Sequence, residues 1–211
     1  MKQKIIKALQ WRYAAQVFDS EKKISAEDLA VILESGRLAP SSYGFEPWKF
    51  IVVENQDVRA KLREAGFGQP KITEASHLIV LARRTDARQN IVSERIERTA
   101  KANDQTSESL QGFRDMLDGS LAKQSDEALD ADMRSQVFIP LGIMVETASL
   151  LGIDSAPMGG FIPEQFDEIL GLRAKNLTAT VLLALGYRGT DSAADRPKVR
   201  RSAEEVIEFV K

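Results

Sequence analysis

The segment "DADMRSQVFIPLGIMVETASLLGI", residues 130–153, constrains the fold more than any other part of the chain. It predicts a long helix that is apolar almost all round from Val137 to Leu151, and such a helix must be buried on several sides. Pro140 lies inside it, where a proline removes an intrahelical hydrogen bond and is expected to kink the helix. In a chain of 211 residues, this helix is expected to pack against a second subunit as well as its own sheet.

The rest of the chain alternates between helix and strand patterns. Helices are expected at 3–11, at 57–66, and from the N-cap Ser25 to just before Pro40. Strands are expected at 49–54, 76–83 and 178–187, and residues 154–162 are expected to form a loop that leads into a helix near Pro163. Residues 203–211 form a last short helix or strand. The alternation predicts an α+β or α/β domain of three layers, with the sheet topology left open.

Residues 86–130 differ from their surroundings. They are highly charged, low in aromatic residues and rich in helix formers, with a Gly119-Ser120 pair. We expect one or two exposed helices interrupted at that pair, whose charges form a solvated face. The chain is therefore interpreted as a single domain, residues 1–211, with a charged helical excursion at about 86–130.

Bulk composition excludes several classes of function. The formal net charge of −2 predicts no general attraction to nucleic acid or to an anionic membrane. The absence of cysteine excludes disulfides, thiolate nucleophiles and Cys-ligated metals, and it fits a cytoplasmic protein. The N-terminus does not resemble a signal peptide, and no segment predicts a transmembrane helix. The single histidine, His77, is interpreted as structural because one imidazole makes no metal site by itself, so no metal is expected.

The usual nucleotide fingerprints are also missing, since neither G-x-G-x-x-G nor G-x-x-x-x-G-K-[ST] occurs. The polar candidates lie instead in loops between apolar elements. They are Arg12, Ser41, Ser42, Gln69, Lys71, the glycines of "APMGG" (156–160), and Lys198, Arg200 and Arg201 of "DRPKVRR". Arginine and lysine together suit a phosphate. No nucleophile or general base can be nominated, so catalysis would depend on a bound cofactor.

In their order along the chain, these segments resemble the nitroreductase family of flavin enzymes. "WRYAAQVFD" is similar to the family's opening "R-x-S-x-[KR]-x-F", and "APSSYGFEPWKFIVV" to its "P-S-x-x-N-x-Q-P-W-x-F". "QPKITEASHLIVL" and "SQVFIPLGIMVETASLLGIDSAPMGGF" resemble its strand with "eAsh" and its central helix and following loop. "ALGY…RPKVRRS" is similar to the closing strand and tail, so the resemblance extends over about 5–200.

The resemblance implies a three-layer α/β/α fold with a mostly antiparallel sheet and a buried central helix at a dimer interface. It implies a homodimer that shares two FMN sites, and a two-stage reaction in which NADH or NADPH reduces the flavin. A small-molecule acceptor such as a nitroaromatic or quinone then oxidises it in the same cleft. Two alternatives remain open: a non-enzymatic flavin carrier or sensor, and a specialised dehydrogenase or dehalogenase of the same fold.

By the same resemblance Arg12, Lys198 and Arg200 would hold the FMN phosphate, while Gln69 and Lys71 would face the flavin ring. The full set of implied cofactor contacts is Arg12, Tyr13, Ala14, Gln16, Ser41, Ser42, Gly44, Gln69, Lys71, Gln136, Pro157, Met158, Gly159, Gly160, Lys198 and Arg200. Ser41 and Ser42 would contact the FMN held mainly by the other subunit. No side chain is assigned a catalytic role.

Several positions depart from the family's pattern. Ala14 stands where Ser is common, Gln16 where Lys or Arg is common, and Gly159 where some members have Glu. Gly44 and Glu46 replace Asn and Gln. The lost amide near the flavin is expected to leave an open spot lined by Tyr43 and Phe45, which we expect to contact the substrate.

Overall fold

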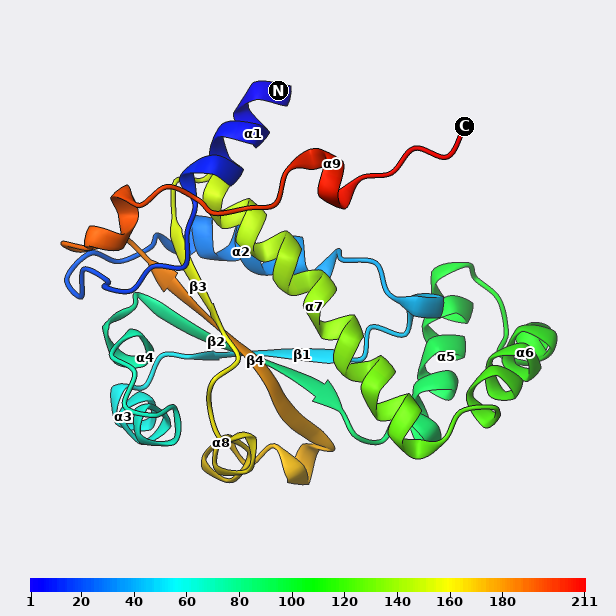
Figure 1. Cartoon of the computed structure of the whole chain (residues 1–211). Helices are drawn as coiled ribbons and strands as arrows, with labels where there is room; N and C mark the ends of the chain where they lie inside the picture. The colour runs from blue at the N-terminus through cyan, green and yellow to red at the C-terminus, as the bar shows by residue number, and fades with distance from the viewer.

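The computed structural model describes all of residues 1–211 and contains a four-stranded sheet covered by helices on both faces (Figure 1). The strands are β1 (Trp48–Val53), β2 (His77–Arg84), β3 (Asp154–Met158) and β4 (Leu177–Gly186). The helices are α1 (Lys2–Trp11), α2 (Ala26–Arg37), α3 (Gln56–Ala65), α4 (Lys71–Glu74), α5 (Val92–Ala102), α6 (Gln111–Ala122), α7 (Asp126–Leu150), α8 (Pro163–Leu170) and α9 (Ala203–Val206).

The sheet has the order β1-β2-β4-β3, and every neighbouring pair is antiparallel. The two central strands β2 and β4 carry the most apolar sequences, because both of their faces are covered. On one face, Leu62 of α3 and Phe166 of α8 are buried against the sheet. On the other, Ile32 of α2 and Met144 of α7 are buried against it. The predicted three-layer α/β/α fold with an antiparallel sheet is therefore confirmed.

The expected loop at 154–162 is wrong in its first half, because residues 154–158 form strand β3. Pro157 made this segment look like a loop, since a proline cannot donate a ladder hydrogen bond. However, β3 is an edge strand whose only neighbouring strand is β4, and its other side carries a single bridge, from Ala14 to Ser155. A proline is tolerated in such a strand because its N–H is not needed for the ladder. The loop is confined to the glycines and the residues that precede Pro163, where α8 begins as predicted.

The charged excursion contains two helices, α5 and α6, that project from the sheet (Figure 1). The predicted break at Gly119-Ser120 is wrong: both residues lie inside α6, and the chain turns instead after α5, where Asp104 has a φ of 50°. A glycine inside an exposed helix lowers the stability of the helix by only about 1 kcal/mol relative to alanine. The excursion also has an apolar core of its own, which includes Phe45, Ile96, Leu117 and Met133.

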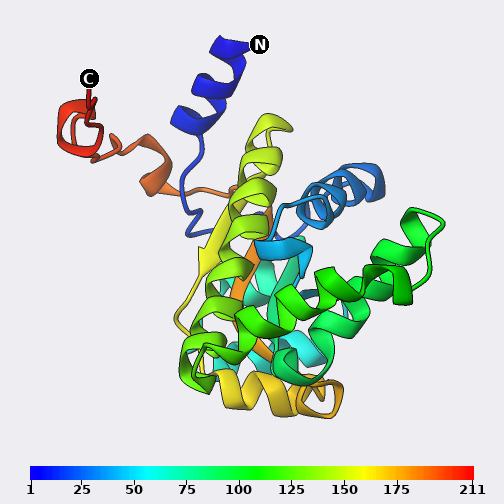
Figure 2. The same cartoon turned by 90° about the vertical axis from the view of Figure 1, so that its right-hand side faces the viewer.

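Helix α7 runs through Pro140 and contacts all four strands. Only one of its faces is buried within the chain. Phe138 and Ile139 on the other face are 45% and 38% exposed, which leaves an apolar stripe without a partner in this subunit. The chain's ends lie at one end of the molecule, opposite α8 (Figure 2). The tail makes a single turn, α9, and then runs extended with Phe209 and Val210 exposed. None of the helices combines the length and the apolar character that a bilayer span requires.

Candidate cofactor site

A cleft of about 610 Å³ lies between the end of α1 and the tail after β4. It brings together most of the residues predicted to hold a phosphate, although they are separated by almost the whole chain. Its lining consists of Gln10, Trp11, Arg12, Tyr13, Ala14, Ala193, Ala194, Arg196, Pro197, Lys198, Val199 and Arg200. Four of these side chains are cationic and none is a carboxylate, so the cleft is built for an anion.

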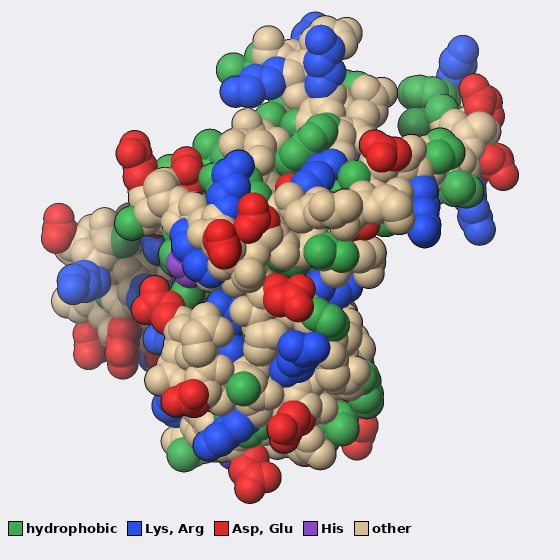
Figure 3. All heavy atoms as spheres, turned by 90° about the vertical axis from the view of Figure 1, so that its left-hand side faces the viewer, with side chains coloured by type: hydrophobic (Ala, Val, Ile, Leu, Met, Phe, Trp, Pro, Cys, Tyr) green, Lys and Arg blue, Asp and Glu red, His purple; other side chains and the backbone are tan.

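The cations in this cleft repel one another. Burial, and then the charge of Arg200, lower the pKa of Arg12, whose Nε is buried and has no hydrogen-bond partner. Burial and the charges of Arg12 and Arg200 lower the pKa of Lys198, whose Nζ donates to the Arg12 carbonyl. An anion bound among these groups would pair the orphaned Arg12 Nε and relieve the repulsion. On the face shown in Figure 3, basic side chains are interspersed with acidic ones.

Asp191 holds the segment that follows Arg12, and the sequence analysis did not identify it. One carboxylate oxygen accepts hydrogen bonds from Tyr13 Oη at 2.8 Å, Gln16 N at 2.7 Å and Val17 N at 3.2 Å, and the other accepts from Ala193 N at 2.9 Å. Burial opposes ionisation, but these bonds prevail and lower the pKa of Asp191 to about 2. Burial and the bond to Asp191 raise the pKa of Tyr13.

Arg188 and Asp154 form a second support that sequence analysis missed. The Arg188 guanidinium is bound to the buried Asp154 at 2.6 Å and lies over the rings of Trp11 and Tyr13, 4.4 and 4.6 Å from their centroids. The strand end at Asp154 is thereby tied to both aromatic residues that flank Arg12. No local sequence signal marks either residue, because their partners are distant in the chain.

The residues predicted to face the flavin ring lie next to this cleft and are linked by hydrogen bonds; we call Gln16, Gln69, Lys71, Gly159 and Gly160 the band. Gln16 Nε2 donates to the Ala14 carbonyl at 2.6 Å, and Lys71 Nζ donates to Gln16 Oε1 at 3.3 Å. Gln69 Nε2 donates to the Gly160 carbonyl at 2.7 Å. The structure therefore brings Gln16, Lys71, Gln69 and the two glycines together. Burial lowers the pKa of Lys71, partly offset by Asp191.

Strand β3 supplies the floor beside this band. Ala14 forms a parallel bridge with Ser155, whose buried Oγ has no hydrogen-bond partner. Pro157 is half-buried, and the Met158 side chain is buried in the core, so Met158 offers only its backbone to a ligand. Gly159 and Gly160 are exposed and have nothing within 4 Å of an added Cβ, which leaves room above their backbone.

The remaining predicted residues lie elsewhere in the chain. Ser42 N donates to Gln136 Oε1 of α7 at 2.8 Å, and Glu46 N donates to Ser41 Oγ at 2.8 Å. This loop and the band lie on opposite sides of α7 (Figure 1). Phe45 is only 3% exposed and belongs to the core of the excursion, so the expectation that it lines an open site is not met within one chain. Tyr43 is 44% exposed.

The expected open spot at Gly44 is also filled. An added Cβ at Gly44 would lie 2.8 Å from Arg95 Cζ, so a guanidinium occupies the space that a side chain would need. The Nδ1 atom of His77 lies 3.0 Å from Ser76 Oγ, and burial lowers the pKa of the imidazole. No group of three metal-binding side chains occurs.

Comparison with known proteins agrees with this geometry. The model of the nitroreductase family matches residues 9–187. A Staphylococcus aureus protein named "Putative NAD(P)H nitroreductase" is 37% identical over 218 residues, which cover 100% of this chain and 97% of the relative. Among solved structures, a nitroreductase-like protein from Streptococcus mutans has a TM-score of 0.84 at 21% identity, with 100% of each chain covered. A "putative nitroreductase in complex with FMN" from Exiguobacterium sibiricum has a TM-score of 0.80 at 24% identity, covering 99% of this chain and 96% of that one.

The two solved structures establish the fold, and the family model and the relative establish membership of the family. The family match spans the Arg12 segment, the loop at 41–46, helix α7 and the glycines after β3, which carried most of the resemblance in the sequence. The tail with Lys198 and Arg200 lies beyond the matched residues. The chain therefore belongs to the nitroreductase family.

Proposed function

We propose that the chain is an FMN-dependent NAD(P)H oxidoreductase that works as a homodimer. The observation that carries the proposal is the cleft of Arg12, Arg196, Lys198 and Arg200, which has no carboxylate in its lining and a buried, unpaired Arg12 Nε. A phosphate monoester fits this donor set. Family membership, the names of the relatives and the FMN complex of a structural neighbour support FMN as its bearer.

The chain's own residues bind and orient the cofactor. Arg12, Lys198 and Arg200 would hold its phosphate, Tyr13 and Ala14 would lie along it, and Lys71 would supply positive charge near the ring, because Gln16 is neutral. Bound there, FMN supplies the redox chemistry, taking two electrons from NAD(P)H and passing them to a small-molecule acceptor such as a quinone or nitroaromatic in two stages.

Two features of α7 support the proposed homodimer. Its exposed stripe at Phe138 and Ile139 is apolar and without a partner in the chain. In Figure 1 the end of α1 and helix α4 lie on one side of α7, whereas α5, to which the loop at 41–46 is bonded, lies on the other. One chain therefore does not bring these two halves of the predicted site together. A two-fold dimer packed through α7 would set the loop of one subunit against the cleft of the other. Each of the two sites would then contain residues of both subunits.

Reconstitution with two flavins tests the proposal. Apoprotein is titrated with FMN and with riboflavin, which lacks the phosphate. FMN is expected to bind more tightly than riboflavin, because only FMN carries the phosphate that the cationic cleft would bind. The FMN-loaded protein is then reduced anaerobically with NADH or NADPH and reoxidised with menadione or a nitroaromatic. Equal affinity for the two flavins would contradict the assignment of the cleft, and a loaded protein that turns over no acceptor would indicate a carrier or sensor.

A further inference from the structure

The loop at 41–46 has an unusual backbone. Tyr43, Gly44 and Glu46 all lie in the left-handed region, with φ values of 54°, 67° and 51°. Glycine adopts this conformation freely, but Tyr43 and Glu46 carry a Cβ and are strained there. Strained residues persist only where the surrounding structure holds them. The contacts that hold this loop therefore determine where Ser41 and Ser42 lie.

The donors of the loop are satisfied locally. Gly44 N bonds to Ser41 O at 3.0 Å, Phe45 N to Ser42 O at 3.1 Å, and Glu46 N to Ser41 Oγ at 2.8 Å. These bonds form the turn η1 (Ser42–Gly44), but no backbone N–H donates to the carbonyls of residues 43–45.

Two arginines of α5 donate hydrogen bonds to these carbonyls. Arg95 Nε donates to Tyr43 O at 2.9 Å, and Arg98 Nη2 donates to Gly44 O at 3.2 Å and Phe45 O at 3.3 Å. The Arg95 guanidinium also packs against Gly44, where any Cβ would lie 2.8 Å from its Cζ. The loop therefore takes its shape from side chains on the excursion, which lies outside the sheet.

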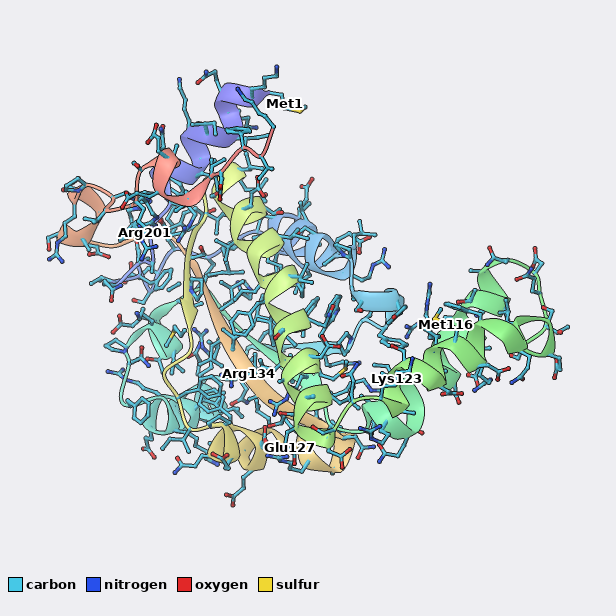
Figure 4. The ribbon with its side chains drawn as sticks, turned by 45° about the vertical axis from the view of Figure 1, so that its right-hand side comes forward. Met1, Met116, Lys123, Glu127, Arg134 and Arg201 are labelled. Carbon is cyan, nitrogen blue, oxygen red and sulfur yellow. The ribbon has the colours of Figure 1, made fainter.

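Helix α6 adds a third contact to the same loop. Tyr43 Oη lies 3.3 Å from Ser120 Oγ, and Tyr43 lines a hollow with Met116 and Gly119 of α6 and with Lys123, which follows α6. Figure 4 shows Met116 on α6 and Lys123 at the C-terminal end of that helix. Together with Phe45, which is buried beneath α5 and α6, these contacts attach one side of the loop to the excursion.

We propose that Arg95 and Arg98 are positioning residues that hold the loop at 41–46 in its strained form and so present Ser41 and Ser42 to the cofactor. The inference rests on the proposed function for the identity of that cofactor. It gives the charged excursion a role in flavin binding, although neither arginine is placed in contact with the flavin.

The test uses the full chain with Arg95→Ala, Arg98→Ala and Arg95→Lys, and with Lys101→Ala as the matched control. Lys101 is an exposed cation on the same helix that makes no bond to the loop. Hydrogen exchange in the apoprotein reads the loop directly, through the amides of Gly44, Phe45 and Glu46. FMN titration and thermal unfolding are then measured on the same samples.

We expect exchange at these amides to accelerate at least tenfold in both alanine variants and FMN to bind at least fivefold more weakly. Lys101→Ala should match the wild type, and Arg95→Lys should recover part of the FMN affinity because a lysine can still donate one hydrogen bond to Tyr43 O. Unchanged loop exchange, or FMN affinity within twofold of the wild type in both alanine variants, would overturn the proposal. If Arg95→Ala fails to fold, Arg98→Ala and Arg95→Lys decide the question. Wild-type protein that binds no FMN would instead contradict the proposed function. The exchange data would still show whether Arg95 and Arg98 hold the loop at 41–46.

Discussion

Asp191 offers the sharpest test of how the cofactor segment is held in place. Its two carboxylate oxygens accept four hydrogen bonds, three of them from the segment Tyr13–Val17. Replacing Asp191 by Asn removes the charge and turns one acceptor oxygen into a donor group that faces a donor. The Tyr13–Val17 segment then loses part of its attachment to the tail, although Gly189 N still donates to Val17 O. Arg12, which precedes the segment, is held less firmly.

The expected cost can be worked from the lowered pKa. The change from 3.8 in the unfolded chain to about 2 in the folded protein corresponds to at most about 2.5 kcal/mol. Solvent screening of this partly exposed carboxylate reduces the figure to about 1–2 kcal/mol. Because the folded pKa is depressed, this contribution is fully present above about pH 4 and is lost as the pH falls towards 2.

Urea unfolding of the apoprotein at several pH values measures this contribution. Asp191→Asn should be about 1–2 kcal/mol less stable than the wild type at pH 7. The difference should shrink as the pH falls from about 4 and vanish only below pH 2, because the folded pKa is about 2. Asp195→Asn is the matched control, since Asp195 lies in the same turn, is exposed and makes no side-chain bond. Equal stability of Asp191→Asn and wild type at pH 7 would refute the reasoning. A difference that stays constant down to pH 2.5 would show that shape, and not charge, holds the segment.

Three further predictions concern the cleft and α7. Arg12→Ala should weaken FMN binding by about 10- to 100-fold, because a hydrogen bond to a charged group contributes about 1.5–3 kcal/mol. Riboflavin binding should stay nearly unchanged. Equal losses for both flavins in a titration would contradict the phosphate assignment. FMN affinity should fall at alkaline pH as Lys198, whose pKa is lowered, loses its proton, and Lys198→Arg should remove that fall in a pH series because arginine stays charged. Ile139→Asp, on the exposed stripe of α7, should shift the protein to monomer in analytical ultracentrifugation and abolish tight FMN binding, whereas a dimer that persists would contradict the α7 interface.

The elements that sequence analysis predicted correctly are those with local causes. Helix α2 begins after Ser25 because that side chain accepts the Asp28 N–H, a contact over three residues. The central strands β2 and β4 are apolar runs because both faces of the sheet are covered. The role of Pro157 depends instead on the place of β3 in the sheet. An edge strand tolerates a proline, but the edge is defined by strands distant in the sequence.

The candidate site shows the same contrast between residues marked by local sequence and residues whose role depends on distant contacts. Arg12, Lys198 and Gln69 could be predicted as cofactor contacts because they lie in segments that resemble a known family, and these assignments stay predictions. Asp191 was missed because an aspartate in a polar tail looks like any solvated residue. Its partner Gln16 N is 175 positions away, and no pattern in the tail reports that contact. Arg188 was missed for the same reason, since its pairing with Asp154 exists only after β3 and the tail are in place.

Gly44 shows what such long-range contacts do to a family comparison. The family often has Asn at this position, and the sequence alone predicts an empty space where that amide is lost. In the structure the space is filled by Arg95, which donates to the adjacent carbonyl of Tyr43. Gly44 and Arg95 therefore form one unit, and restoring the amide alone creates a clash. Gly44→Asn should weaken FMN binding, although asparagine tolerates positive φ, and adding Arg95→Ala should recover part of the loss. A double-mutant cycle on the FMN dissociation constant measures this coupling. Strictly additive effects would show that the glycine and the arginine act independently, and the amide would then have been lost for another reason.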